Sequence, residues 1–261
     1  MQTRPSIEQV LFSSAQEYEV SSATQFSQGT ALFSLLPDLA EGRALDVGCG
    51  NGLLTLEMAR QLSRCQVDGI DVSPDMVEVA RGHVGPQDEG RVHFEAADLF
   101  AFAPPYRYQL VFSNATMHWL LPANAAYGRL SQLLVPGGEL VVCQGGRGCY
   151  FGLWELAAAI VSEAGVSLDG WHYPASYPTK DEMEQLLARS GFSDIEVYSW
   201  ATDGSELPSL YKDFASAGLL PFARLLPEAL QEGFRAEFLR RAEAYQPSRY
   251  THRVVAHAVR R

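Results

Sequence analysis

The feature that most constrains this chain is a glycine-rich string, ALDVGCGNG, at residues 44–52. It follows a short apolar run typical of a strand and precedes residues 53–62, whose apolar positions recur at helical spacing. Gly48, Gly50 and Gly52 occupy the turn between them. A Cβ there would block a sharp turn and the close approach of a ligand, and the helix start offers free N–H groups to an anionic or carboxylate-bearing ligand. The string predicts a nucleotide-type binding turn.

Apolar runs alternate with helical patterns along residues 30–145, as in βαβ units. The spacing predicts strands at 43–47, 65–71, 91–98, 108–115 and 138–144, and helices at 29–39, 53–62, 73–84 and 123–134. Two longer helical stretches follow, separated by one helix–strand pair at 179–200, and the chain ends in a strand at 250–261. We expect an α/β fold: a Rossmann-like, mostly parallel seven-stranded sheet with helices on both faces and an inserted helical cap.

A length of 261 residues favours one domain carrying an insertion over two independent domains. We expect its core at about 30–145, 178–202 and 249–261, and cap elements at about 1–28, 146–177 and 203–248. The apolar stripes of the cap helices need a surface to bury, and the carboxyl edge of the sheet offers one. A cap there would close a ligand site against water.

Composition narrows the possible partners. The formal net charge is −11, and Lys and Arg never cluster in fours, so nucleic acid is a poor partner. The four cysteines form no C-x-x-C pair, and the six histidines show no metal-ligand spacing, so we expect no metal. With no secretory pattern and no long apolar run, the expected location is the cytoplasm, without a membrane partner. Nothing in the sequence indicates the oligomeric state.

Polar residues follow the predicted strands at the points where the strands end. Asp71, 19 residues after Gly52, ends the second strand, where a carboxylate can accept both hydroxyls of a ribose. Asp98, followed by Leu99, ends the third strand, where it can accept from the amine of an adenine, and Asn114 ends the fourth. Open α/β sheets bind ligands at the carboxyl ends of their strands.

Two other nucleotide motifs fit less well. A dinucleotide fingerprint needs Gly or Ala at position 53, where this chain has leucine, so NAD is disfavoured though not excluded. A Walker A loop fails because no Lys-Ser/Thr pair follows the glycines.

Taken together, the DxGCGxG turn, the acidic end of strand two in DxSxxM, the AxD sequence and the VPGG turn resemble the class I S-adenosylmethionine-dependent methyltransferases, over roughly residues 10–145. The resemblance implies S-adenosyl-L-methionine as cofactor and a function for each matching residue. Asp46, Gly48 and Gly50 would line the methionine end, Asp71 hold the ribose, Val72 and Met76 flank the adenine, Asp98 and Leu99 bind its edge, and Asn114 close the pocket.

Within that family, three segments resemble the malonyl-acyl-carrier-protein O-methyltransferase and trans-aconitate methyltransferase group. They are F-x-x-A-x-x-Y at Phe12, Ala15 and Tyr18, the string SNATMHWL, and the terminal RYTHRVVAHAVRR. This resemblance implies a small-molecule or carrier-bound acyl acid as the acceptor.

Four residues are candidates for contact with the acceptor. His118 follows strand four, where it would orient the substrate or accept its proton, or else pack with Trp119 at a helix start. Arg147 would hold a substrate carboxylate, or be a solvated loop arginine. Tyr18 and Trp119 would contact the substrate, although packing is the more common use of such aromatic residues.

The favoured function is therefore methyl transfer to a small or carrier-bound acid, at a carboxylate oxygen. A carboxylate is already anionic and needs no general base, whereas carbon or phenol O-methylation, the first alternative, would need one. An NAD-dependent oxidoreductase is the second alternative, and a non-catalytic module that keeps the fold is the third.

Overall fold

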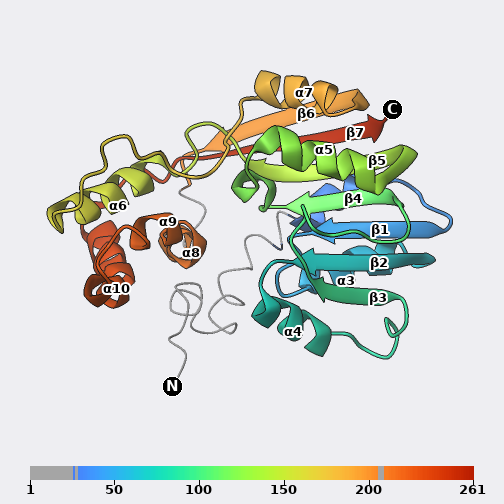
Figure 1. Cartoon of the computed structure of the whole chain (residues 1–261), viewed down its shortest axis with the longest axis horizontal. Helices are drawn as coiled ribbons and strands as arrows, with labels where there is room; N and C mark the ends of the chain where they lie inside the picture. Colours follow the sequence, from blue (N-terminus) through green and yellow to red (C-terminus); the bar gives the residue numbers. More distant parts are fainter. Residues whose placement is uncertain (1–25, 27–28, 205–208) are drawn as a thin grey trace. The chain divides into compact units, whose positions relative to one another are not determined.

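A computed structural model describes residue 26 and residues 29–204 and 209–261, which fall into two compact units. The sheet unit comprises the described residues of 25–147, 175–200 and 253–261. The helical unit comprises 148–174 and the described residues of 201–252. Figure 1 shows the sheet with its flanking helices in the first unit and a group of helices in the second.

Seven strands form one sheet in the order β3-β2-β1-β4-β5-β7-β6. Their bounds are β1 Gly42–Val47, β2 Cys65–Asp71, β3 Val92–Ala96, β4 Tyr108–Asn114, β5 Leu134–Gly145, β6 Phe192–Thr202 and β7 Thr251–Arg260. The first five strands pair in parallel, and β7 runs antiparallel to β5. The expected Rossmann-like, mostly parallel sheet is confirmed, and the carboxyl ends of β1, β2 and β4 meet at one edge.

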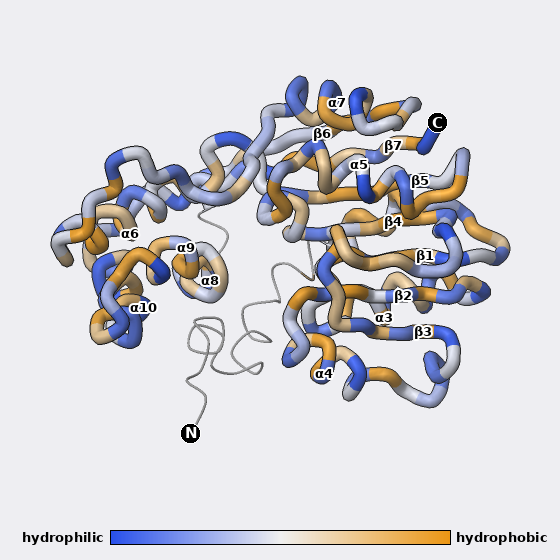
Figure 2. Tube along the Cα trace, viewed as in Figure 1, coloured by the Kyte–Doolittle hydropathy of each residue, from blue (hydrophilic) through white to orange (hydrophobic). Residues whose placement is uncertain are grey.

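Helices bury apolar residues on both faces of the sheet. The 3-10 helix η1 (Leu32–Leu35), α3 (Leu53–Gln61) and α4 (Pro74–Gly82) contribute to one hydrophobic cluster. Helices α5 (Ala123–Leu133) and α7 (Lys180–Arg189) contribute to another. The strands supply both clusters with alternate residues, since successive side chains of a strand point to opposite faces. Figure 2 shows the resulting hydrophobic runs along β4 and β5.

Several elements differ from their expected bounds. The strand expected at 91–98 is β3, Val92–Ala96, so Asp98 and Leu99 lie in the loop after the strand and do not end it. The helix expected at 29–39 ends at Leu35, because Leu36 precedes Pro37 and is extended (φ −69°, ψ 139°). Strand β5 begins at Leu134 instead of residue 138, pairing there with Tyr108 before the register shifts. The second helical stretch divides into α8 (Leu210–Ala217), α9 (Leu220–Ala223) and α10 (Glu228–Tyr245), with prolines at the starts of the last two.

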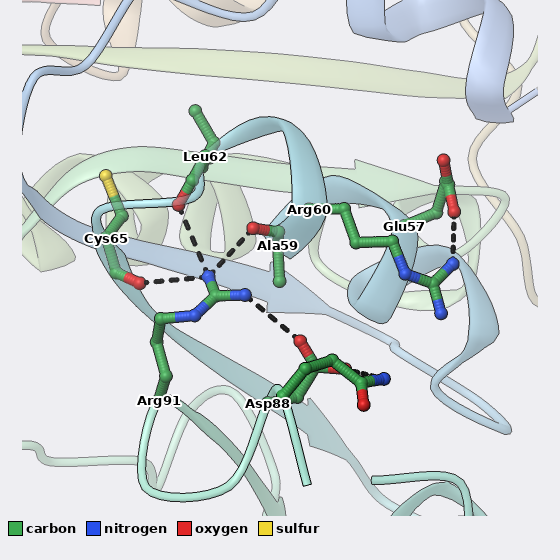
Figure 3. Close-up of polar contacts among 8 residues, drawn as sticks. Glu57, Ala59, Arg60, Leu62, Cys65, Asp88 and Arg91 are labelled. Atoms are coloured by element: carbon green, nitrogen blue, oxygen red, sulfur yellow. Dashed lines mark hydrogen bonds and ion pairs between the residues drawn. The ribbon is translucent and has the colours of Figure 1, made fainter. Parts of the chain in front are cut away.

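One ion pair, between the partly exposed Arg91 and the fully buried Asp88, ties α3 to β2 and β3. The Arg91 guanidinium donates to the carbonyls of Ala59 (2.8 Å), Leu62 (3.3 Å) and Cys65 (3.3 Å), and to the buried carboxylate of Asp88 (3.0 Å), as Figure 3 shows. The carbonyls at the end of a helix lack partners within the helix. Arg91 therefore satisfies the end of α3 and holds it against the sheet.

The helical unit has its own core. Helix α6 (Phe151–Glu163) packs with α8, α9 and α10, and the Trp154 ring stacks on Tyr173 with centroids 4.4 Å apart. The Tyr173 hydroxyl donates to the Gly218 carbonyl at 2.9 Å. No helix within the described residues is long and apolar enough to cross a membrane.

Candidate cofactor and acceptor site

The glycine turn is held against β2 at the carboxyl edge of the sheet. The amides of Gly48 and Cys49 donate to the Ile70 carbonyl at 2.8 and 3.0 Å. Gly48 has φ +77°, and a Cβ there would lie 2.0 Å from the Thr116 Oγ1 atom. Only glycine fits this position, because both the backbone conformation and the approach of Thr116 exclude a side chain. The turn is thereby brought against the loop that follows β4.

Asp71 joins the glycine turn to the start of α4. Its Oδ2 atom accepts the Gly50 amide and its Oδ1 atom accepts the Ser73 amide, each at 2.9 Å. Burial raises the pKa of this carboxyl, although the bonds from Ser73 and Gly50 oppose the shift. Each carboxylate oxygen has a second lone pair, so Asp71 can still accept hydroxyl groups from a ligand.

Asp46, the last residue but one of β1, lies below the turn with 2% of its surface exposed. The Thr55 hydroxyl donates to its Oδ2 atom at 2.6 Å. Burial raises the pKa of Asp46 to about 7; the Thr55 bond opposes the shift, and the charge of Asp71 adds to it. Two carboxyls with raised pKa values therefore lie at one end of the turn, an arrangement that favours a positively charged ligand group.

The residues expected around an adenine lie on the loops after β2 and β3. Val72 is 75% exposed directly beside Asp71, and Met76 lies in the first turn of α4. The Asp98 Oδ1 atom accepts the Phe100 amide at 2.7 Å, and Asp98 itself is exposed. Leu99 is buried in the core, so its side chain packs inward. The two loops meet where the Ala97 amide donates to the Asp71 carbonyl at 2.9 Å.

Asn114 ends β4 close to the first described helical turn. A Cβ on Gly29 would lie 3.1 Å from the Asn114 Nδ2 atom and 2.4 Å from Leu54. The chain before η1 therefore approaches Asn114 at this edge. The next residue, Ala115, has a left-handed backbone (φ +58°) and donates its amide to the Cys143 carbonyl at 2.8 Å.

His118 lies in the 3-10 helix η2 (Met117–Trp119) and is 6% exposed. Its ring is 5.1 Å from that of Trp119 and 5.2 Å from that of Tyr177. Burial, with the charge of Arg253, lowers its pKa to about 3. The imidazole is therefore neutral near pH 7 and suited to hydrogen bonding, and its buried Nδ1 atom has no hydrogen-bond partner within the described residues.

Arg147 binds Glu182 at the start of α7. Its guanidinium donates to both carboxylate oxygens, at 2.6 Å for Oε2, and both side chains are largely exposed. Its amide donates to the Pro178 carbonyl at 3.2 Å. Arg147 thus has a structural partner, and its proposed use as a carboxylate grip stays a prediction. Tyr18, with Phe12 and Ala15, lies outside the described residues.

Two buried polar residues near His118 were absent from the sequence-based site. Gln144 lies in β5 with 1% of its surface exposed, and Arg253 in β7 with 6%. Gln144 follows the apolar run 140–143, and Arg253 precedes the apolar run 254–256, but no spacing in the sequence indicates that either residue lies beside His118. Strand pairing places them together, since Arg253 lies opposite Gly145.

Comparison with known proteins matches residues 44–138 to a family described as a methyltransferase domain. A malonyl-[acyl-carrier protein] O-methyltransferase of Ilyobacter polytropus is 30% identical over 146 residues, covering 56% of this chain and 51% of that protein. A trans-aconitate 2-methyltransferase of Rhizobium meliloti is 36% identical over 111 residues, covering 42% and 41%. The chain thus spans about half the length of these curated relatives, or less.

Solved structures share the fold at low sequence identity. A phosphoethanolamine N-methyltransferase of Haemonchus contortus in complex with S-adenosyl-L-methionine is 18% identical, with a TM-score of 0.64, covering 99% of this chain and 61% of the other. A [4+2]-cyclase is 16% identical, with a TM-score of 0.60, covering 89% and 80%. Because a cyclase shares the fold, the fold alone does not specify the reaction.

Proposed function

Because this chain contains a methyltransferase domain of the class I S-adenosylmethionine-dependent family, we propose that it transfers a methyl group from that cofactor to a carboxylate oxygen of a small or carrier-bound acid. The observation that carries the proposal is the Asp71 carboxylate, which bridges the glycine turn after β1 and the start of α4. It presents an acceptor for ribose hydroxyls at the carboxyl edge of the sheet.

The residues of the turn fit S-adenosyl-L-methionine. Gly50 leaves the backbone open beside Asp71, and Val72 offers an exposed apolar surface for one face of an adenine. Burial raises the pKa of both Asp46 and Asp71, and a nearby cation would favour their ionised forms, so the two carboxyls fit a cofactor that carries an ammonium and a sulfonium group. Asp98 would accept a hydrogen bond from the exocyclic amine of the adenine. The side chain of Met76 and the backbone of Leu99 would flank the adenine ring.

When bound, the cofactor supplies a methyl group already activated for transfer. The work of the chain is then to hold the cofactor, align the acceptor oxygen and exclude water. Asp71 holds the ribose end, and Asn114 and the Gly48 turn border the methionine end. His118 and Trp119 follow at the next turn and orient the acceptor.

The protonation state of His118 and the charge of Arg253 favour a carboxylate as the methyl acceptor. His118, with its pKa near 3, is a weak proton acceptor, as suits an acceptor that needs no base. The positive charge of Arg253 acts on the same imidazole, and such a field attracts an acid and repels an amine. A carbon or phenol acceptor would need a base that His118 does not supply. The two relatives described above are named as methyltransferases of a malonyl group on acyl carrier protein and of trans-aconitate, both of which are acids.

The test is methyl transfer from S-adenosyl-L-methionine labelled in its methyl group. We would offer trans-aconitate, a malonyl thioester on acyl carrier protein, phosphoethanolamine and a catechol in parallel. Label should enter the acids alone and be released as methanol by alkali, which cleaves methyl esters. Label in phosphoethanolamine or the catechol, stable to alkali, would refute carboxylate methylation and leave methyl transfer standing. Absence of cofactor binding by calorimetry would refute both.

A further inference from the structure

A chain of buried hydrogen bonds runs from α5 to His118 across the carboxyl ends of β4 and β5. The Tyr127 hydroxyl donates to the Gln144 Oε1 atom at 2.8 Å. The Gln144 Nε2 atom donates to the Ser176 carbonyl at 3.2 Å, and the Ser176 amide donates to the His118 carbonyl at 2.8 Å. Tyr127 and Gln144 are each 1% exposed, so the chain is shielded from water over its first two members.

The next residue, Tyr177, contacts the imidazole ring of His118 directly. Its ring lies 5.2 Å from that of His118 at an interplanar angle of 31°. Ser176 and Tyr177 therefore hold His118 at two points, the backbone carbonyl and the ring face. The Pro178 carbonyl accepts the amide of Arg147, two residues after the end of β5, at 3.2 Å. The segment 176–178 is thus anchored along the end of β5, with Gln144 as its buried side-chain anchor.

Burying an amide side chain in an apolar core costs free energy unless all its groups are bonded. The side chain of Gln144 is bonded at both ends, although the cluster around Tyr127 is otherwise apolar. A leucine or methionine at this position would fill the same volume without a polar group. A glutamine at position 144 is explained if its function is to hold segment 176–178 in place and not to fill space in the core.

We propose that Gln144 is a positioning residue, which fixes segment 176–178 and through it the orientation of the His118 imidazole toward the acceptor. The proposal rests on the proposed function, which supplies both the acceptor and the contact of His118 with it. His118 contacts the substrate, whereas Gln144 acts on the reaction only through His118 and Tyr177. Tyr127 supports Gln144 from α5 and has a weaker effect, because its loss leaves the bond to Ser176 in place.

The first test needs neither cofactor nor acceptor. Histidine ring nitrogens of the full chain, labelled with ¹⁵N, are recorded by NMR, and a His118→Gln variant identifies the His118 signals. Gln144→Met should shift or broaden these signals as the ring samples a second orientation or tautomer, and Tyr127→Phe should do so less. His118 signals in Gln144→Met that superimpose on those of the unmodified protein would overturn the proposal.

A matched control is the hydrogen bond of Tyr108, which lies at the amino end of β4 in the same sheet. The Tyr108 hydroxyl donates to the buried Asp68 carboxylate at 2.8 Å, the same length as the Tyr127 bond. Tyr108→Phe removes one buried bond without touching segment 176–178, and it should leave the His118 signals unchanged. Equal perturbation by Tyr108→Phe would mean that general loosening of the unit, and not Gln144, moves the ring, and would also refute the proposal.

The second test measures turnover with an acceptor found by the labelling experiment. Gln144→Met should lower kcat by about 10- to 100-fold, as expected when a reacting group is misplaced. The dissociation constant for S-adenosylhomocysteine should stay within about twofold, because the side chain of Gln144 bonds to Tyr127 and Ser176, neither of which is proposed to hold the cofactor. The variant combining His118→Gln with Gln144→Met should be no slower than His118→Gln alone. A further loss in the combined variant would assign Gln144 an independent structural role and overturn the proposal.

Discussion

The carboxylate of Asp71 accepts the amide of Gly50 at 2.9 Å, which ties the end of β2 to the turn that follows β1. Twenty-one residues separate the two in sequence. The bond places the carboxylate of Asp71 at the edge of the glycine turn. It also holds together the loop after β1 and the loop after β2. The carboxylate that stabilises the turn is therefore the same group that we propose as the acceptor for the ribose hydroxyls.

Replacement of Asp71 by alanine should weaken cofactor binding. Ribose hydroxyls would lose a charged partner, at a cost of about 1.5 to 3 kcal/mol, or roughly tenfold to more than a hundredfold in affinity. Calorimetric titration with S-adenosylhomocysteine measures the change. Asp75→Ala is the control, since Asp75 is an exposed carboxylate in the first turn of the neighbouring helix. Unchanged affinity in a folded Asp71→Ala protein would exclude Asp71 from the ribose site.

Asp46 makes stability depend on pH. Its pKa is raised from 3.8 to about 7, so the folded state holds the proton more tightly than the unfolded state. Its contribution to stability is therefore full below about pH 4 and is lost as the pH rises through about 7, by up to about 4 kcal/mol. Asp46→Asn keeps an oxygen for the Thr55 hydroxyl and removes the ionisation.

Thermal unfolding at pH 5 and pH 8 tests this prediction. The unmodified protein should lose more stability between the two values than Asp46→Asn does. Some loss should persist in the variant, because burial raises the pKa of Asp71 in the same direction. Identical losses in the two proteins would show that Asp46 ionises without cost and would contradict its raised pKa.

Gly48→Ala should destabilise the protein more than Gly137→Ala. Both glycines have a left-handed backbone, with φ of +77° and +76°, so alanine is strained by about 1 to 2 kcal/mol at either. A Cβ at Gly48 also meets Thr116 at 2.0 Å, whereas nothing lies within 4 Å of one at Gly137. The steric conflict should add about 1 to 3 kcal/mol. Equal unfolding free energies in denaturant would mean that the loop of Thr116 yields freely.

Arg91→Leu should destabilise the fold without acting at the site. The change leaves the fully buried Asp88 carboxylate without its cation, and breaking a buried pair costs about 3 to 5 kcal/mol. Arg60→Leu, which removes the exposed pair with Glu57 drawn beside it in Figure 3, should cost at most about 1 kcal/mol. Chemical denaturation compares the two. A small effect of Arg91→Leu would mean that α3 is held by its apolar face alone.

The βαβ region could be predicted closely, because its signals are local. The expected strand at 65–71 matches β2 residue for residue, and the helix expected at 53–62 matches α3 within one residue. The predicted bounds of an element were wrong where a strand partner distant in sequence, or a proline, sets the end of that element. Leu134 joins β5 by pairing with Tyr108, and Leu36 leaves the helix because Pro37 follows it. For the site, Asp71 was indicated by its offset from the glycine turn, whereas nothing in the spacing indicated Gln144 or Arg253.

The sequence by itself determined the glycine turn, the order of strands and helices, and the strand ends that carry Asp46, Asp71 and Asn114. These follow from local backbone preference and from periodicity, which neighbouring residues set. Tertiary structure alone decided the protonation of His118, since its pKa depends on burial and on Arg253, 135 positions away in sequence. It also decided that Arg147 binds Glu182 and that Gln144 reaches Ser176. Charge and hydrogen bonding depend on what packing brings within a few ångströms, which no local pattern encodes.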